Sequence, residues 1–129
     1  MAERVRLSGP LNVAALQAAL NEMVCRHEIL RTTYSAEAAQ PVQVIHPPRP
    51  VELPVSDLSA LPPAEREAHA EALALEDARR PFDLSRDPVL RARLVRLDAT
   101  DHRLLLTLHH IAGDAWSLAV LFRELGTLY

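Results

Sequence analysis

The fold is decided by one stretch near the end of the chain, Leu104-Leu105-Leu106-Thr107-Leu108-His109-His110-Ile111-Ala112-Gly113-Asp114-Ala115-Trp116-Ser117. An apolar run of this length predicts a buried strand, and that strand ends at two histidines. A Gly-Asp turn follows and predicts the start of a helix, with apolar positions at Trp116, Leu118, Val120, Leu121, Phe122 and Leu125. We therefore expect any chemistry to lie at the junction between this strand and this helix.

The two histidines at the end of the strand are the candidate catalytic residues. Neighbouring residues on a strand point to opposite faces, so we expect one of His109 and His110 to pack into the fold and the other to face a cleft. Imidazole exchanges a proton near neutral pH because its ordinary pKa is about 6.5, which makes the cleft-facing histidine a candidate general base. Asp114 either orients an imidazole ring, is held by an arginine elsewhere, or caps the following helix.

Two other roles for the histidine pair stay open at this point. A His-His pair at a strand end is often purely structural. A metal site is disfavoured because the two side chains are expected to diverge and Cys25 is the only cysteine, which leaves a structural zinc cluster without thiolates.

A second block of polar residues, Arg26-His27-Glu28-Ile29-Leu30-Arg31-Thr32, ends an earlier helix. Asn12 is the expected N-cap of that helix, and its apolar residues recur at helical spacing at Leu16, Leu20, Met23 and Val24. A charged helix end needs no active site to explain it, so we interpret Arg26, Glu28 and Arg31 as a solvated cluster that ties the helix to its neighbours.

The remaining elements complete one α+β unit. We expect strands near residues 5–7, 32–35, 42–46 and 89–97, an extended edge segment at 51–57, and a mostly exposed helix from Pro63 to about Ala78. The Asp98-Ala99-Thr100-Asp101 turn predicts a hairpin into the apolar strand. These elements predict helices packed on a mixed or antiparallel sheet.

The composition is that of a single globular domain. The chain has 129 residues, of which 49% are hydrophobic and 24% charged, and its formal net charge is -3. No basic patch indicates a nucleic-acid partner, and no apolar segment resembles the core of a signal peptide or a membrane span. One cysteine gives no disulfide framework and favours the reduced cytosol, so we expect a cytoplasmic protein with neither a nucleic-acid nor a membrane partner.

The two polar blocks together resemble a known family. Residues 109–115 are similar to the HHxxxDG signature of the condensation domains of non-ribosomal peptide synthetases, and Trp116-Ser117 fits the usual continuation. Residues 26–32 are similar to the RHExLRT block that precedes that signature, and Pro81-Phe82-Asp83-Leu84 is a further match. The resemblance implies one lobe of a fold like that of chloramphenicol acetyltransferase.

The resemblance also implies a reaction and its partners. In such domains a donor acyl or peptidyl thioester and an acceptor aminoacyl thioester enter on the phosphopantetheine arms of carrier proteins, and the acceptor amine forms the amide bond. The implied catalytic residue is His110, with His109 as its packed partner and Asp114 as an architectural residue that meets an arginine of the second lobe. No bound cofactor and no metal is expected. Gly113 and Trp116 complete the motif, and Arg26, His27, Glu28 and Arg31 have structural roles.

The sequence departs from the family pattern in two ways that affect the expected activity. Ala115 stands where the motif has its final glycine, and at a positive φ its methyl group would cost about 1 kcal/mol. Residues 1–129 match only the front part of the family pattern, so we expect a partial condensation domain, truncated at both ends, whose second lobe is absent. Such a fragment is expected to be inactive alone and to need the C-terminal lobe or a larger synthetase.

Three alternatives compete with condensation. An epimerisation domain shares the histidine signature, although its sequence after the motif usually differs from Trp116-Ser117. Another HxxxD acyltransferase lobe shares the shorter part of the motif. A non-catalytic module that docks a carrier protein or a separate lobe would use the same fold without chemistry.

Overall fold

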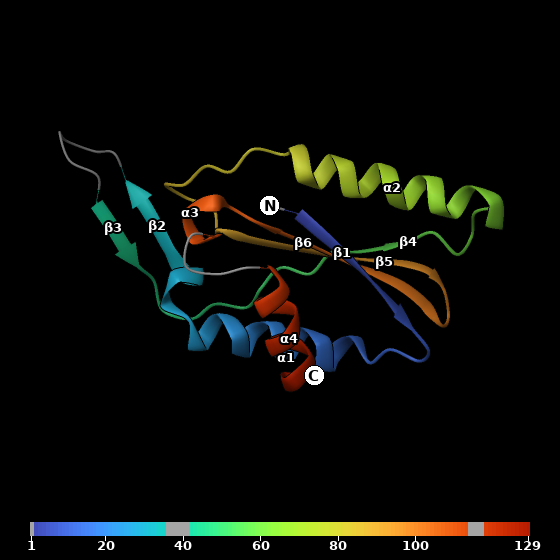
Figure 1. Cartoon of the computed structure of the whole chain (residues 1–129), viewed down its shortest axis with the longest axis horizontal. Helices are drawn as coiled ribbons and strands as arrows, with labels where there is room; N and C mark the ends of the chain where they lie inside the picture. The colour runs from blue at the N-terminus through green and yellow to red at the C-terminus, as the bar shows by residue number, and fades with distance from the viewer. Residues whose placement is uncertain (1, 36–41, 114–117) are drawn as a thin grey trace.

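A four-stranded mixed sheet forms the centre of the molecule (Figure 1). The computed structural model describes residues 2–35, 42–113 and 118–129. The strands are β1 (Ala2–Ser8), β4 (Val55–Asp57), β5 (Leu90–Asp98) and β6 (Asp101–Leu108), in the order β1-β6-β5-β4. β6 runs antiparallel to both β1 and β5, and β4 runs parallel to β5. The predicted α+β class and the mixed sheet are confirmed.

Strand β6 lies between β5 and β1, and every residue from 102 to 108 is buried. Leu104, Leu106 and Leu108 belong to the main core on one face of the sheet, whereas Leu105 belongs to a smaller core on the other face. Layers on both faces explain why this strand reads as a continuous apolar run and not as an alternating one. The β5–β6 hairpin turns as expected, with the amide of Thr100 donating to Oδ1 of Asp98 at 2.8 Å.

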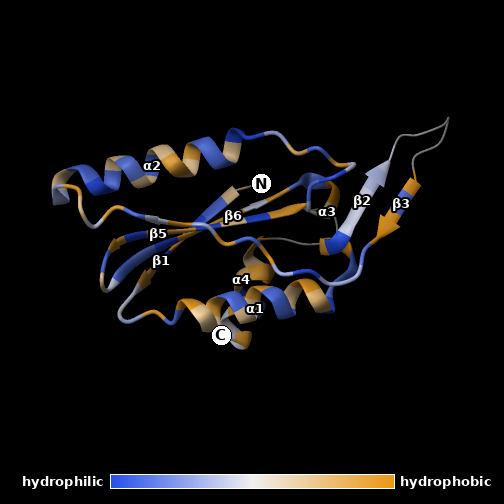
Figure 2. Cartoon of the chain, turned by 180° about the vertical axis from the view of Figure 1, so that it is seen from behind, coloured by the Kyte–Doolittle hydropathy of each residue, from blue (hydrophilic) through white to orange (hydrophobic). Residues whose placement is uncertain are grey.

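Two helices cover the main-core face of the sheet (Figures 1 and 2). α1 (Val13–Arg26) begins at the predicted N-cap, where Oδ1 of Asn12 accepts a hydrogen bond from the amide of Ala15 at 3.0 Å. α4 (Leu118–Leu128) packs against α1 and buries three leucines, Leu118, Leu121 and Leu125. The helical spacing of these leucines follows the pattern seen in the sequence.

Helix α2 (Pro63–Arg79) covers the opposite face and stays mostly exposed, as its composition predicts (Figure 2). Its buried residues are Ala70 and Asp77. Asp77 accepts a hydrogen bond from Nε of Arg93 on β5 at 2.8 Å, and Glu67 pairs with Arg103 on β6. Charged contacts with the sheet therefore replace much of the apolar packing that this helix lacks.

Strands β2 (Thr32–Ser35) and β3 (Val42–Ile45) form a separate antiparallel ribbon at one end of the molecule (Figure 1). A short 3-10 helix, η1 (Glu28–Arg31), links α1 to β2. Both strands were expected, and all four residues of β3 are exposed. The amide of Tyr34 donates to the carbonyl of Leu84 at 2.7 Å, which joins this ribbon to the loop after α2.

No helix in the described ranges is long and apolar enough to span a lipid bilayer.

Candidate functional site

The histidine pair straddles the end of β6 and the start of a helical turn. β6 ends at Leu108, and α3 (His110–Gly113) begins two residues later. The amide of His109 still donates to the carbonyl of Val89 at 2.8 Å, and the carbonyl of His109 accepts from the amide of Ala112 at 3.0 Å. The two histidines therefore do not alternate on one strand, and that part of the sequence argument is wrong. The backbone changes from strand to helix between them.

His109 is the more enclosed of the two histidines. Its ring is half-buried and meets the ring of Phe82 edge to face, with centroids 5.4 Å apart. Nδ1 of His109 accepts a hydrogen bond from the amide of Ile111 at 3.1 Å, which places the proton of the neutral ring on Nε2. Burial lowers the pKa of His109, and the neighbouring His110 lowers it further. His109 is therefore neutral near pH 7.

His110 is exposed at the first position of α3. Its ring centroid lies 5.5 Å from that of His109, with the ring planes tilted by 57°. The expected divergence of the two side chains is therefore also wrong, because the rings are neighbours that differ in burial. Exposure makes His110 the histidine that an external substrate can reach, and its catalytic role stays a prediction.

The structure describes only part of the signature that follows the two histidines. Gly113 is the last residue of α3. Asp114, Ala115 and Trp116 lie outside the described residues, so their roles also stay predictions. In the described parts of the chain, no three His, Cys, Asp or Glu side chains gather in a way that could hold a metal ion.

The second block ties α1 to two other elements. Arg31 is half-buried, and its guanidinium donates to the carbonyls of Val24 and Cys25 at the end of α1 and to the carbonyl of His46 after β3. These carbonyls would otherwise lack partners where the helix ends. Arg31 therefore ties the helix end to its neighbours as expected, but the expectation of a solvated cluster does not fit this half-buried side chain. It fits Arg26 better, because Arg26 is exposed and pairs with Glu22 at 2.9 Å.

His27 connects the block to the helix that follows the signature. Its Nε2 lies 2.6 Å from Oε1 of Glu124 on α4, and both side chains are about three-quarters buried, with 26% and 23% of their surface exposed. Glu28 is exposed in the first turn of η1. The pairing of His27 with Glu124 joins residues 97 positions apart, and no local pattern predicts it.

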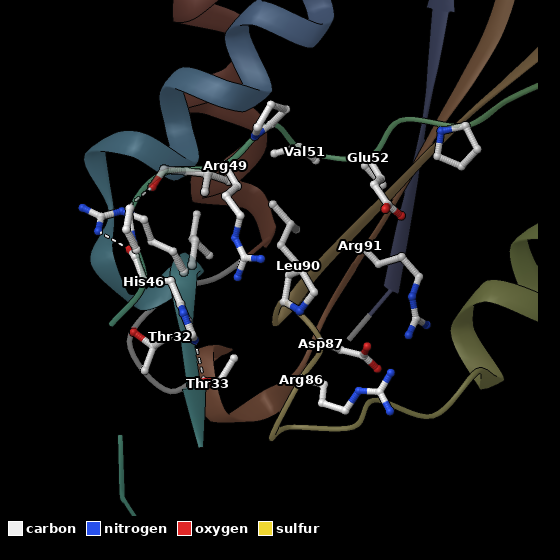
Figure 3. Close-up of a pocket in the computed structure, with 18 of the residues that line it drawn as sticks. Thr32, Thr33, His46, Arg49, Val51, Glu52, Arg86, Asp87, Leu90 and Arg91 are labelled. Atoms are coloured by element: carbon white, nitrogen blue, oxygen red, sulfur yellow. Dashed lines mark hydrogen bonds between the residues drawn. The ribbon is translucent and has the colours of Figure 1, made fainter. Parts of the chain in front are cut away.

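A cavity of about 430 Å³ lies beside the histidine junction, between the β2–β3 ribbon and the start of β5 (Figure 3). Its wall includes Arg91, whose guanidinium carbon lies 4.2 Å from the centre of the Phe82 ring. Phe82 thus contacts both Arg91 and His109. The sequence analysis named Phe82 only as part of a family-like match, and it did not predict that Phe82 would contact Arg91 and His109.

Comparison with known proteins identifies a family. The model of the family described as "Condensation domain" matches residues 1–129. Chondramide synthase cmdD from Chondromyces crocatus is 48% identical over 123 residues, which cover 95% of this chain and 3% of that protein. Nonribosomal peptide synthetase kk1B from Curvularia clavata is 42% identical over 125 residues, which cover 97% of this chain and 1% of that protein.

A solved structure agrees in fold. The X-domain from teicoplanin biosynthesis, solved as a complex with OxyB, superposes on the whole of this chain and on 27% of that chain. The TM-score is 0.88 and the sequence identity is 39%. The chain therefore spans a small part of the length of each of these three relatives.

Proposed function

The chain belongs to the condensation-domain family, and on that premise we propose that it contributes the histidine-bearing part of a catalyst that forms amide bonds in nonribosomal peptide synthesis. The proposed substrates are an acyl or peptidyl thioester and an aminoacyl thioester, each held on the phosphopantetheine arm of a carrier protein. The observation that carries the proposal is the exposed His110 at the start of α3, two residues after the buried strand β6 and beside a neutral, half-buried His109.

In the proposed step, the amine nitrogen of the acceptor attacks the carbonyl carbon of the donor thioester. The new C–N bond forms, the C–S bond breaks, and the donor's phosphopantetheine leaves as a thiolate. His110 holds or accepts the proton that the amine loses, and the leaving thiolate is protonated in turn. His110 then takes up the proton of the attacking amine in place of solvent water.

His109 has a supporting role in this proposal. The contact with Phe82 and the hydrogen bond from the amide of Ile111 fix the ring of His109 in one orientation. Because its lowered pKa keeps it uncharged, His109 adds no positive charge beside His110. A neutral neighbour of this kind leaves the exposed imidazole free to gain a proton during the reaction.

The proposal also includes the cellular compartment and the protein partners. We place the protein in the reduced cytoplasm, where the exposed Cys25 stays a thiol. Carrier proteins are the proposed partners, and the remainder of a condensation domain is proposed to complete the site, since the chain matches only 27% of the X-domain chain.

The test measures amide formation between two loaded carrier proteins. The chain is assayed alone and after addition of a second lobe from a homologous condensation domain, and product is expected only in the second case. His110→Ala is expected to lower the rate about a hundredfold or more, as for loss of a general base. An unchanged rate in a His110→Ala protein with an unchanged circular dichroism spectrum would show that His110 does not take part in the reaction.

A second candidate function is that of a binding module. It is favoured by the 39% identity to an X-domain that was solved in complex with OxyB. A binding module would retain its partner after His110→Ala and would give no amide product in any combination. The amide assay together with a pull-down on carrier protein therefore separates the two candidates.

A further inference from the structure

The cavity beside the histidine junction is strongly cationic. Five arginines line it, Arg31, Arg49, Arg80, Arg86 and Arg91, and its acidic residues are Glu52 and Asp87. Its wall therefore carries an excess of three positive charges, whereas the chain as a whole has a formal net charge of -3. A concentration of charge opposite to that of the whole chain raises the local concentration of anions.

Two of these arginines are fixed by the backbone. Arg31 donates to the carbonyls of Val24 and His46, and Arg91 donates to the carbonyls of Asp77, Arg80 and Pro81. Neutral carbonyls orient a guanidinium without cancelling its charge. Burial lowers the pKa of Arg91, and the charge of Arg80 lowers it further, so the cationic groups here repel one another.

The other three arginines are exposed at the rim. Among the described residues, no carboxylate forms an ion pair with Arg49, Arg80 or Arg86. Figure 3 shows Arg49 on one side of the cavity and Arg86 and Arg91 on the other. Such an arrangement suits an anion bound between them, since guanidinium groups match the oxygens of a phosphate or a carboxylate.

The remaining wall is mostly apolar, apart from Thr32, Thr33 and His46. Its apolar residues are Val24, Leu30, Val51, Leu90 and Ala92, and its prolines are Pro47, Pro50, Pro54 and Pro88. Prolines restrict the backbone, so little order has to be gained when a ligand binds. The volume of about 430 Å³ falls in the ordinary range for small-molecule sites. A suitable ligand therefore combines an anionic group with an apolar body.

We propose that this cavity is a binding site for an organic phosphate monoester, with the phosphate between Arg49 and Arg86 and the apolar body over Leu30 and Leu90. An excess of three positive charges fits a dianionic phosphate better than a singly charged carboxylate. His109 and His110 do not line the cavity, so the proposal is independent of the amide-forming step.

Phenyl phosphate is the probe, because it has one phosphate and one compact apolar group. Titration calorimetry with the purified 129-residue chain is expected to give tighter binding for phenyl phosphate than for inorganic phosphate, phenol or benzoate. The affinity is expected to fall as salt is added, since exposed arginines are screened at an ionic strength of about 0.15 M. Equal or tighter binding of benzoate would overturn the choice of phosphate.

Variants at the rim test the site itself. Arg49→Gln/Arg86→Gln is expected to weaken phenyl phosphate binding about tenfold or more, since charge-assisted hydrogen bonds are lost. Arg123→Gln on α4 removes an exposed charge outside the cavity and is expected to leave the affinity unchanged. Circular dichroism checks that each variant is folded. If the folded double variant binds as tightly as the wild type, or the wild type does not bind at millimolar concentration, the proposal is wrong.

Discussion

Truncation of Leu121 tests whether α4 is held by its leucine face. Leu121 has no exposed surface and lies in the core between α1, α4 and the sheet. Replacing a fully buried leucine with alanine removes the transfer energy of its carbons and leaves a cavity, and together these cost about 3 kcal/mol. A loss of that size is a large part of a domain stability on the order of 5–15 kcal/mol.

Leu75→Ala provides a matched control. Leu75 lies on α2 and is 50% exposed, so the same chemical change removes little buried surface there. A substitution of this kind is expected to change the free energy of unfolding by about 0.5 kcal/mol or less. The contrast between the two variants therefore isolates burial from the loss of leucine itself.

Urea unfolding followed by far-ultraviolet circular dichroism measures both variants. Leu121→Ala is expected to lower the unfolding midpoint without changing the slope, because the surface exposed on unfolding is nearly the same. Its melting temperature is expected to fall by about 10 °C. A loss below about 1 kcal/mol for Leu121→Ala, or an equal loss for both variants, would refute the view that this face docks α4.

Two further predictions concern buried histidines and the contact between the two motif blocks. His102 is buried, and its Nδ1 has no hydrogen-bond partner among the described residues. Burial lowers the pKa of His102, and the charge of Arg96 lowers it further. Burial also lowers the pKa of His109. The unfolded chain takes up protons on these histidines at a higher pH than the folded chain does. The stability that this difference provides is therefore full above about pH 7, and it is lost as the pH falls through about 6.5 toward the lower folded pKa values. Urea unfolding midpoints at about pH 7.5 and 5.5 would detect this loss, and equal midpoints would contradict it. A double-mutant cycle of His27→Ala and Glu124→Ala is expected to give a coupling of about 1 kcal/mol in unfolding experiments, and additive losses would mean that their 2.6 Å contact does not stabilise the fold.

Local patterns predicted most of the elements. The run from Leu104 to Leu108 is the buried central strand, and the leucine spacing after Asn12 and after Ser117 gave the buried faces of α1 and α4. These predictions held because side-chain periodicity and capping are properties of neighbouring residues. The family resemblance rested on two such local blocks and agrees with the family match over residues 1–129.

Predictions that depended on distant contacts were weaker. The orientation of His109 and His110 was argued from strand alternation, but the chain leaves β6 at Leu108 and His110 already begins a helix. Arg31 was expected in a solvated cluster that ties the helix end to its neighbours; it makes such a tie through two carbonyls of α1 and the carbonyl of His46, but it is half-buried. In both cases the outcome depended on what surrounds the residue in space, which spacing along the chain does not report.

The sequence by itself therefore determined most of the strands and longer helices, the apolar faces of α1 and α4, and the positions of the histidines along the chain. Only the tertiary structure decided that β2 and β3 leave the main sheet and that His27 meets Glu124. The cationic cavity is likewise a tertiary feature, because its arginines come from segments as far apart as Arg31 and Arg91. The physical reason is that backbone periodicity is set by neighbouring residues, whereas charge and burial at a site are set by whichever segments the packing of the core brings together.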